Sequence, residues 1–458
     1  MGGTGPMTAL ITSVSKQNIV SAPSGEYGAA RASENRAARG RRKPRYRVVP
    51  GRPRTKRCEA FAAGRTVSYS PDSALTLHLR PTAEQIALRA EAASFCASLR
   101  PLLESDPEWW RQGMLSDGDS VAVNRALGEA GWIGMSWPVE LGGRRLSRLT
   151  ATLVEEVFGY HWLPLSSYLL SYKTIGAAIE RFGSPALVEQ LLPPIARGEL
   201  VFCQGFSEPG AGSDLGSLTT RAELRGDTYV VNGHKIWTSS AQLADWIYLA
   251  VRTEADAKHR GISVLVCPVD APGIEVRTFP TLGGGYLCET FLDGVEIPAS
   301  NLVGEVNGGW DILMYTLDFE RVTAEKLGGF AWVLDAVEER LLETDRLSDV
   351  AARTLARLRG ELHASRLLSF RAADMLDRGL PGSATSAMAK LSGARLAQSI
   401  GNAAVDLLGL EGLGDASAEV AIQGRAAALY RASVGSTIAG GTAEVQQLVI
   451  ARRGLGLR

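Results

Sequence analysis

Apolar residues recur at helical spacing from about residue 81 onward. Pro81, Thr82 and Glu84 form a typical helix opening. The periodic apolar positions that follow are Ile86, Leu88, Ala92, Phe95 and Leu99. Helical spacing then continues through residues 121–130, 149–158, 165–181 and 185–197. The pattern predicts an N-terminal helical domain over residues 81–200.

Near Leu200 the pattern changes to short strand-like runs. Residues 228–231 and 234–237 flank Asn232-Gly233, which predicts a hairpin with a tight turn. Further strand-like runs follow at residues 246–251, 262–269, 273–279 and 289–297. Runs of this length and spacing are typical of a small all-β unit. We therefore expect a central antiparallel β-domain, a sandwich or barrel, over residues 201–305.

After Trp310 helical spacing returns and extends to the C-terminus. The segments with this spacing are 310–343, 348–378, 383–408, 418–434 and 442–453. Long helices joined by short connections predict a C-terminal helical bundle over residues 306–458. The expected fold class is therefore α+β and multidomain: an N-terminal helical domain, a central antiparallel β-domain and a C-terminal helical bundle.

Residues 1–80 differ in composition from the rest. The first 57 residues hold thirteen Lys and Arg against two acidic residues, among many Gly, Pro and Ser. This composition predicts a disordered basic extension, or a translation start placed too far upstream. An Arg-rich, acid-poor segment is also compatible with an organelle transit peptide, which would place the protein in mitochondria. The first fifteen residues carry no charge, however, which argues against a transit peptide.

Overall composition excludes several function classes. The 49 basic residues balance the 49 acidic ones, which disfavours a nucleic-acid binder. The five cysteines are scattered without a C-x-x-C pair, which argues against a disulfide scaffold and fits a reducing compartment such as the cytoplasm. No apolar run is long enough for a membrane span. The five histidines are isolated, so we expect no metal site.

The most informative stretch is a glycine-rich segment, residues 202–214. Gly210 and Gly212 allow backbone amides to approach a ligand closely, and Ser207 and Ser213 add hydroxyl groups. Consecutive amides among small residues form a concavity suited to a pyrophosphate or a flavin edge. Taken alone, such a run is also compatible with a simple turn between domains.

Three motifs in this order resemble the acyl-CoA dehydrogenase family. The first is the run Glu-Pro-Gly-Ala-Gly-Ser-Asp at residues 208–214, and the second is Trp237 followed by Ser239. The third is the closing segment Gly-Gly-Thr-Ala-Glu-Val-Gln at residues 440–446. The exit from the β-domain, residues 291–304, is also similar. The resemblance covers about residues 81–458, and the combination of motifs is far more specific than each alone.

The resemblance implies bound FAD and a thioester substrate held between the flavin and the late helices. It places the flavin ring against residues 204–207 and 237–239, with Trp237 covering one face. The residues that it assigns to the cofactor are Gln204, Phe206, Ser207, Gly212, Ser213, Trp237, Thr238, Ser239, Thr442 and Glu444. Those that it assigns to the substrate are Ser213, Asp318, Arg321, Gly440 and Gly441.

The reaction of this family needs a carboxylate that removes the proton α to the thioester. One branch of the family carries this Glu directly before the Gly-Thr of the closing segment, where the present chain has Gly440. A second branch carries it on an early helix of the C-terminal domain, which matches Glu320. Glu320 is therefore the candidate catalytic base. The N–H of Gly440 or Gly441 is a candidate donor to the thioester oxygen.

Two positions depart from the family pattern. An Arg-rich segment that ends in Phe-Gly and grips the FAD pyrophosphate of a neighbouring subunit is replaced by the acidic residues 343–350. A Gln near the same phosphates is replaced by Asp406, and a carboxylate beside a pyrophosphate is unfavourable. Three interpretations stay open: a hetero-oligomer whose paralogous partner supplies the phosphate grip, a homo-oligomer with weaker FAD binding, and a non-catalytic chain.

The expected function is FAD-dependent α,β-dehydrogenation of an acyl thioester in fatty acid or lipid metabolism. By resemblance, electrons pass to an electron-transfer flavoprotein and the assembly is a tetramer. The alternatives are a flavin monooxygenase or oxidase on the same fold, and a non-catalytic partner subunit of a heteromeric dehydrogenase. The acyl group, and whether coenzyme A or an acyl-carrier protein bears it, are left open.

Overall fold

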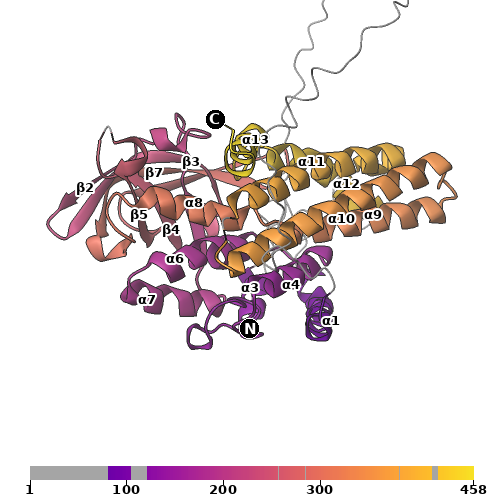
Figure 1. The fold of residues 1–458 in the computed structure, drawn as a ribbon, viewed down its shortest axis with the longest axis horizontal. Helices are drawn as coiled ribbons and strands as arrows, with labels where there is room; N and C mark the ends of the chain where they lie inside the picture. The colour runs from indigo at the N-terminus through magenta and orange to yellow at the C-terminus, as the bar shows by residue number, and fades with distance from the viewer. Residues whose placement is uncertain are drawn as a thin grey trace, which may run out of the picture. The chain divides into compact units, whose positions relative to one another are not determined.

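The computed structural model describes residues 81–104, 121–255, 257–283, 285–380, 382–414 and 421–457. The expectations for residues 1–80, and for the start of the helix expected over 418–434, lie outside these ranges. The described residues form three successive regions, helical, β and helical, which confirms the expected fold class (Figure 1).

The N-terminal region is a set of short helices. They are α1 (Ala83–Ser98), α2 (Arg100–Glu104), α3 (Val121–Glu129), α4 (Arg148–Tyr160), α5 (Ser166–Tyr168), α6 (Ala177–Phe182) and α7 (Pro185–Ala196). A π-helical segment, Leu169–Gly176, connects α5 to α6. Side-chain caps fix several helix starts: Thr82 forms a capping box with Gln85, and Ser147 and Ser184 cap α4 and α7.

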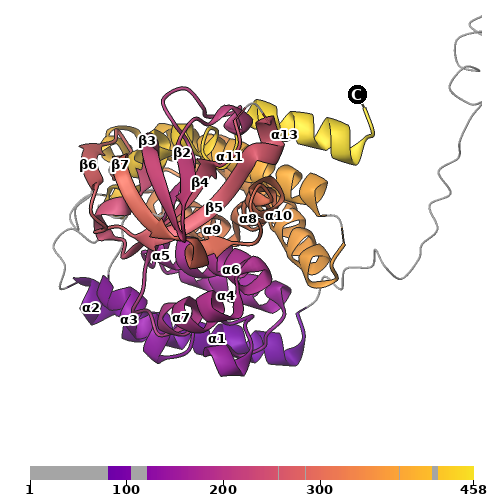
Figure 2. The ribbon, with the colours of Figure 1, turned by 90° about the vertical axis from the view of Figure 1, so that its left-hand side faces the viewer.

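The central region is one eight-stranded sheet. Its strands are β1 (Phe202–Gly205), β2 (Arg221–Arg225), β3 (Thr228–Ser239), β4 (Trp246–Arg252), β5 (Ile262–Pro268), β6 (Ile274–Pro280), β7 (Tyr286–Pro298) and β8 (Leu302–Val303). The order is β6-β7-β3-β2-β4-β5-β8, with β1 paired to β4. The sheet is mixed and not purely antiparallel as expected, because β1 and β2 run parallel to β4. Figure 2 shows β7, β3, β2, β4 and β5 side by side above the N-terminal helices.

The predicted hairpin at Asn232-Gly233 is wrong, because β3 runs through both residues without turning. The register of β3 against β7 shifts at this point instead, as in a β-bulge. Gly233 is needed there because an added Cβ would lie 2.4 Å from the Thr220 hydroxyl oxygen. The actual turn joins β2 to β3 through Gly226, whose φ of +66° suits glycine.

The C-terminal region contains the long helices. They are α8 (Gly309–Glu320), α9 (Ala324–Glu343), α10 (Asp349–Asp377), α11 (Ser383–Leu408), α12 (Arg425–Ser436) and α13 (Ala443–Val449), followed by a π-helical turn, Ile450–Gly454. The helix expected over 310–343 is divided, because the chain leaves the helix after Glu320 and re-enters it at Ala324. This break determines where the side chain of Glu320 lies.

Among the described residues, three large apolar cores and one small cluster of Val322, Ala372 and Ala373 hold these regions together. One joins the N-terminal helices, one face of the sheet and α8. Another fills the bundle of α9 to α12 and includes Trp162. The third is formed almost entirely by side chains of the sheet, so the sheet curls around its own core. Because α8 belongs to the first core, it is packed against the sheet, and its C-terminal end lies beside α11 of the bundle.

Candidate active site

Glu320, the candidate base, is the last residue of α8. Its Oε2 atom is buried and has no hydrogen-bond partner among the described residues. The side chain faces a cavity that is lined by α9, α11 and the loop before α13. Its lining residues include Arg321, Thr323, Lys326, Phe330, Lys390, Gly393, Ser436 and Gly440. A buried carboxylate oxygen without a donor is costly, and such a group is a candidate for a ligand or for chemistry.

Gly440 lies directly against the Glu320 carboxylate. A Cβ atom added to Gly440 would be 3.0 Å from Glu320 Oε1. Gly440 and Gly441 both have positive φ, +66° and +94°, and both carbonyl oxygens accept from Gln446 Nε2 at 3.1 Å. The Gln446 side chain, fully buried, therefore fixes the orientation of the two glycine peptides beside Glu320.

Asp318 and Arg321 form an ion pair next to the base. Arg321 Nη1 is 2.9 Å from Asp318 Oδ1. The same carboxylate accepts from the hydroxyls of Ser383 and Ser386 at the start of α11. Asp318 therefore ties the end of α8 to α11, and a direct substrate role stays a prediction.

Lys390 is a residue of this cavity that the sequence reading missed. It lies on α11, is buried, and donates from Nζ to the Ser436 carbonyl at 2.9 Å. Burial and the nearby Lys326 lower the pKa of Lys390 to about 8, although Glu320 acts in the opposite direction. The signal in the sequence was a lysine within the otherwise apolar run 387–391 of a predicted helix, because buried lysines are rare without a specific partner.

The residues assigned to the flavin ring lie at the ends of β1 and β3. Gln204 is on β1, Phe206 and Ser207 follow it, and Trp237, Thr238 and Ser239 end β3. The Ile236 N–H donates to the Ser207 carbonyl at 3.0 Å, which brings the two groups together. Gln204 Oε1 and Thr238 Oγ1 are buried without a hydrogen-bond partner among the described residues.

Trp237 has an unusual backbone conformation. Its φ is +63°, which is rare for a bulky residue, at a register shift in β3 between Lys235 and Thr238. The indole is 57% exposed and contacts the Phe279 ring edge-on at 5.5 Å. Backbone strain of this kind persists at functional sites, where it directs a side chain to a ligand.

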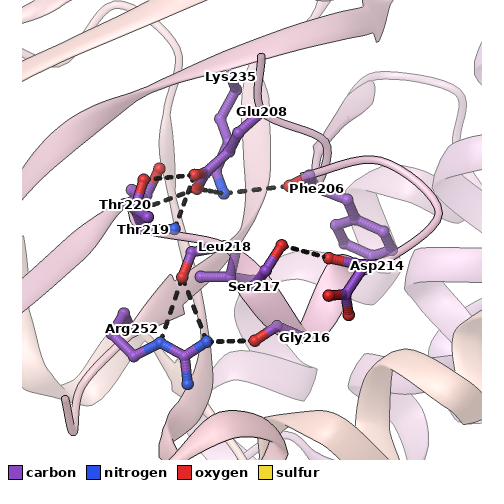
Figure 3. A network of polar contacts seen from close by, with 10 residues as sticks. All are labelled: Phe206, Glu208, Asp214, Gly216, Ser217, Leu218, Thr219, Thr220, Lys235 and Arg252. Atoms are coloured by element: carbon purple, nitrogen blue, oxygen red, sulfur yellow. Dashed lines mark hydrogen bonds and ion pairs between the residues drawn. The ribbon is translucent and has the colours of Figure 1, made fainter. Parts of the chain in front are cut away.

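A buried polar network supports the loop that carries Phe206 and Ser207 (Figure 3). Glu208 accepts from the N–H groups of Thr219 and Thr220 at 2.7 and 2.8 Å, and from Lys235 Nζ at 2.8 Å. Lys235 also donates to the Phe206 carbonyl at 3.1 Å. Burial alone would raise the pKa of the Glu208 carboxyl, but Lys235 and the other donors outweigh it and lower this pKa to about 2.

Two contacts connect this loop to the helix of Glu320. The Phe206 ring lies 5.8 Å from the Tyr248 ring, and the Tyr248 hydroxyl is 3.3 Å from the Thr316 hydroxyl. Thr316 is on α8, one turn before Glu320. The flavin-side residues and the candidate base are therefore linked through β4 and α8.

The remaining predicted cofactor residues lie at two places. Gly212 and Ser213 are exposed on the loop between β1 and β2, and an added Cβ on Gly212 would meet nothing within 4 Å. Thr442 caps α13 by accepting from the Val445 N–H at 3.2 Å, and Glu444 is in the first turn of that helix. The exposed Trp237 and the unpartnered buried oxygens of Gln204 and Thr238 fit a flat, polar-edged cofactor such as FAD.

Comparison with known proteins identifies the family. Three family descriptions match successive parts of the chain: acyl-CoA dehydrogenase, N-terminal domain, at residues 82–199, middle domain at 203–295, and C-terminal domain at 307–455. The chain belongs to the acyl-CoA dehydrogenase family. Named members are oxidoreductases that act on CH–CH groups, and the family is FAD-dependent.

Similar proteins include several mycobacterial enzymes. Acyl-CoA dehydrogenase FadE26 of Mycobacterium tuberculosis is 33% identical over 82% of this chain and 98% of its own length. Acyl-CoA dehydrogenase IpdE1 of the same species is 34% identical over 73% of this chain and 87% of its own. The mitochondrial short-chain specific acyl-CoA dehydrogenase of Mus musculus is 29% identical over 72% and 82%.

Solved structures agree with this assignment. The Tcur3481-Tcur3483 steroid ACAD matches with a TM-score of 0.77 and 32% identity, covering 83% of this chain and 100% of that one. The ChsE4-ChsE5 complex from Mycobacterium tuberculosis matches with a TM-score of 0.73 and 31% identity over 83% and 100%. Within the described ranges, no helix is both long and apolar enough to span a membrane. The same residues contain no group of His, Cys, Asp and Glu that would hold a metal ion.

Proposed function

We propose that this chain catalyses α,β-dehydrogenation of a coenzyme A thioester, with Glu320 as the base. The observation that carries the proposal is the buried, unpartnered Oε2 of Glu320 beside Gly440. A carboxylate oxygen with no donor from the protein is available to accept a proton from a substrate in the adjoining cavity. In the proposed reaction Glu320 removes the α-proton of the thioester. FAD, when bound, accepts the hydride from the β-carbon.

The other site residues position the substrate and the cofactor. Gln446 holds the peptides of Gly440 and Gly441, so that a glycine N–H is available to the thioester oxygen where negative charge develops. Gln204, Ser207, Thr238 and Ser239 would hold the flavin ring, with Trp237 beside it. Gly212 and Ser213 would hold the phosphates. This division of roles agrees with the unpartnered oxygens of Gln204 and Thr238.

The test of the base is Glu320→Gln. This change keeps the side-chain volume and removes the proton acceptor, so the rate of flavin reduction by substrate is expected to fall about a thousandfold while FAD stays bound. Asp311→Asn, an exposed change in the first turn of the same helix, serves as the control and is expected to react normally. Flavin bleaching at nearly the wild-type rate in Glu320→Gln would rule this base out.

The acyl group is to be found with a panel of coenzyme A thioesters, mixed anaerobically with the FAD-loaded protein. Straight-chain, branched and steroid side-chain thioesters belong in the panel, because the matched Tcur3481-Tcur3483 structure is that of a steroid ACAD. Acyl-carrier-protein thioesters are a parallel arm. Reduced flavin that is reoxidised by an electron-transfer flavoprotein supports a dehydrogenase. Rapid oxygen consumption instead would indicate a flavin oxidase or monooxygenase.

We further propose that the working assembly is a hetero-oligomer of the family's tetrameric type. Arg340 and Arg346, at the turn between α9 and α10, are both paired with Glu411 and are thus engaged within the chain. Asp406 is exposed nearby on α11. The matched Tcur3481-Tcur3483 steroid ACAD and the ChsE4-ChsE5 complex are each named after two different proteins. A partner chain would supply the cations that an FAD pyrophosphate needs.

The surface of the bundle is consistent with such an assembly. Tyr430 and Val434 on α12, Ile438 after it, and Leu448 on α13 are large apolar residues that are exposed in the single chain. The test is to purify the chain alone and together with a neighbouring dehydrogenase gene product, measuring flavin absorbance and mass by light scattering. Full flavin occupancy in a homomer would discard the hetero-oligomer. A chain that stays flavin-free and inactive with every partner would be the non-catalytic subunit.

The proposed location is the cytoplasm. The four described cysteines, Cys96, Cys203, Cys267 and Cys288, are buried thiols, which fits a reducing compartment. A fusion of residues 1–80 to a fluorescent reporter would test the mitochondrial alternative.

A further inference from the structure

A buried lysine of the N-terminal helical region contacts the break that follows Glu320. Lys173 is on the π-helical segment and is 8% exposed. Its Nζ donates to the Val322 carbonyl at 2.5 Å, to Glu155 Oε2 at 2.8 Å and to Glu325 Oε2 at 3.2 Å. One ammonium group thus joins α4, the π-helical segment, the break and the first turn of α9.

We propose that Lys173 is a positioning residue for Glu320. By holding the Val322 carbonyl, it fixes where α8 stops and therefore the direction in which the Glu320 carboxylate points. The proposal rests on the proposed function of Glu320 as the base. Lys173 acts through the backbone of the break, residues 321–323, and takes no part in the chemistry itself.

The break creates a need for such a donor. At the end of α8 the N–H groups of Arg321 and Val322 donate to the carbonyls of Leu317 and Phe319, whereas the Val322 carbonyl lies beyond the helix and outside its hydrogen-bond ladder. Val322 is buried, so water cannot readily satisfy its carbonyl. A buried carbonyl left without a donor loses the hydrogen bonds that water would otherwise give it, which disfavours that conformation. Lys173 removes this cost and makes one geometry of the break preferred.

The helix that begins after the break, α9, is held firmly against α4. A Cβ added to Gly159 of α4 would lie 1.8 Å from the Glu325 carbonyl oxygen, and one added to Gly328 of α9 would lie 2.0 Å from that of Glu156. The backbones of α4 and α9 are therefore in direct contact. Because α9 is fixed against α4, the hydrogen bond from Lys173 to the Val322 carbonyl determines the path of residues 321–323 between Glu320 and α9.

The charges of Lys173 and Glu325 are favourable at the end of α8 and at the start of α9. The ammonium lies near the C-terminal end of α8, and Glu325 lies in the first turn of α9, so each charge faces the favourable end of a helix dipole. Arg148 and the hydroxyl of Tyr172 line the adjoining cavity, and Tyr168 is also close. Burial alone would lower the pKa of Lys173, but Glu155 and Glu325 outweigh it and raise this pKa, so the ammonium persists at neutral pH.

The experiment compares flavin reduction in FAD-loaded variants. Lys173→Met removes the donor but leaves two buried carboxylates, which can unfold the protein. A second variant, Lys173→Met with Glu155→Met and Glu325→Met, makes the cluster apolar and still offers Val322 no donor. Lys173→Arg restores a donor. Arg89→Met removes a cation of α1 that pairs with Glu156 of α4 at 2.9 Å, and it controls for lost stability.

In both Met variants of Lys173 we expect the limiting rate of flavin reduction to fall about tenfold to a hundredfold, the effect of misplacing a catalytic group by about 1 Å. FAD content and KM are expected to stay within about twofold. Lys173→Arg recovers most of the rate, and Arg89→Met keeps it.

Wild-type reduction rates in the triple variant, or a loss that Arg89→Met reproduces, would overturn the proposal. So would failure of both Met variants to fold, because the cluster would then serve stability alone. Glu320→Gln is measured in the same series. If that variant reacts normally, the proposed base fails, whereas a slow Glu320→Gln with a fast triple variant refutes only the role of Lys173.

Discussion

The Glu320 carboxylate and the Cα of Gly440 occupy adjoining space, since a Cβ on Gly440 would lie 3.0 Å from Glu320 Oε1. Residue 440 is where the sequence comparison expected a carboxylate in one branch of the family. In this chain the carboxylate reaches the same place from the end of α8. Glycine at 440 is therefore part of the site, because a side chain there would compete with Glu320 for the same volume.

Gly440→Ala is expected to slow flavin reduction about tenfold to a hundredfold, because the new methyl group displaces the carboxylate from its position. The change also strains a residue whose φ is +66°. Gly456→Ala is the matched control, since Gly456 has the same φ and no atom within 4 Å of an added Cβ. Stopped-flow reduction at equal FAD loading separates the two effects. Equal losses in both variants would mean that strain alone is responsible.

Lys390 is expected to make the reductive step depend on pH near 8. Its lowered pKa of about 8 means that the ammonium predominates below this pH and the amine above it. Loss of a positive charge beside Glu320 raises the proton affinity of the carboxylate, so the rate constant should increase as pH rises from 7 to 9. Lys390→Met is expected to lose this transition.

Lys326→Met provides the second arm of that measurement. Lys326 lowers the pKa of Lys390, so its removal should move the transition to higher pH. A rate profile that is identical in all three proteins would show that Lys390 does not act on Glu320.

The Glu208–Lys235 pair is expected to control acid release of FAD. The Glu208 carboxyl has a pKa of about 2 in the folded chain against an ordinary 4.5, so its contribution is complete above pH 4.5 and is lost as pH falls toward 2. Glu208→Gln should weaken FAD binding at neutral pH and flatten this part of the acid profile. Glu223→Gln, which breaks the exposed pair with Arg225, should change neither. Flavin fluorescence against pH measures both.

Helix packing predicts opposite effects on stability for two helical glycines, one at the contact between α4 and α9 and one on the exposed face of α10. Gly159→Ala is expected to destabilise the protein by about 3 kcal/mol, because its Cβ would overlap the Glu325 carbonyl and force the helices apart. Gly360→Ala, on the exposed face of α10 with nothing within 4 Å, is expected to stabilise it by about 0.5–1 kcal/mol. Denaturant unfolding of both variants checks the difference, and a neutral Gly159→Ala would disprove the close contact.

Sequence reasoning identified most helices and strands because their patterns are local. Pro81, Thr82 and Glu84 marked the start of α1, and short strand-like runs marked the strands. The Asn232-Gly233 turn was predicted wrongly because the same dipeptide serves a β-bulge when a neighbouring element, here Thr220, approaches closely. The break after Glu320 was missed because apolar spacing continues through it. The donor that stabilises this break, Lys173, is 149 residues away.

What the sequence alone determined is the order of the three regions, the family motifs and the identity of the candidate base. These depend on residue type and on spacing over a few turns, which the chain carries locally. Only the tertiary structure decided that Glu320 meets Gly440, that Lys390 shares their cavity, and that Lys173 holds the end of α8. Those contacts join residues far apart in the chain, and their energies depend on burial, which arises only when the helices and the sheet pack together.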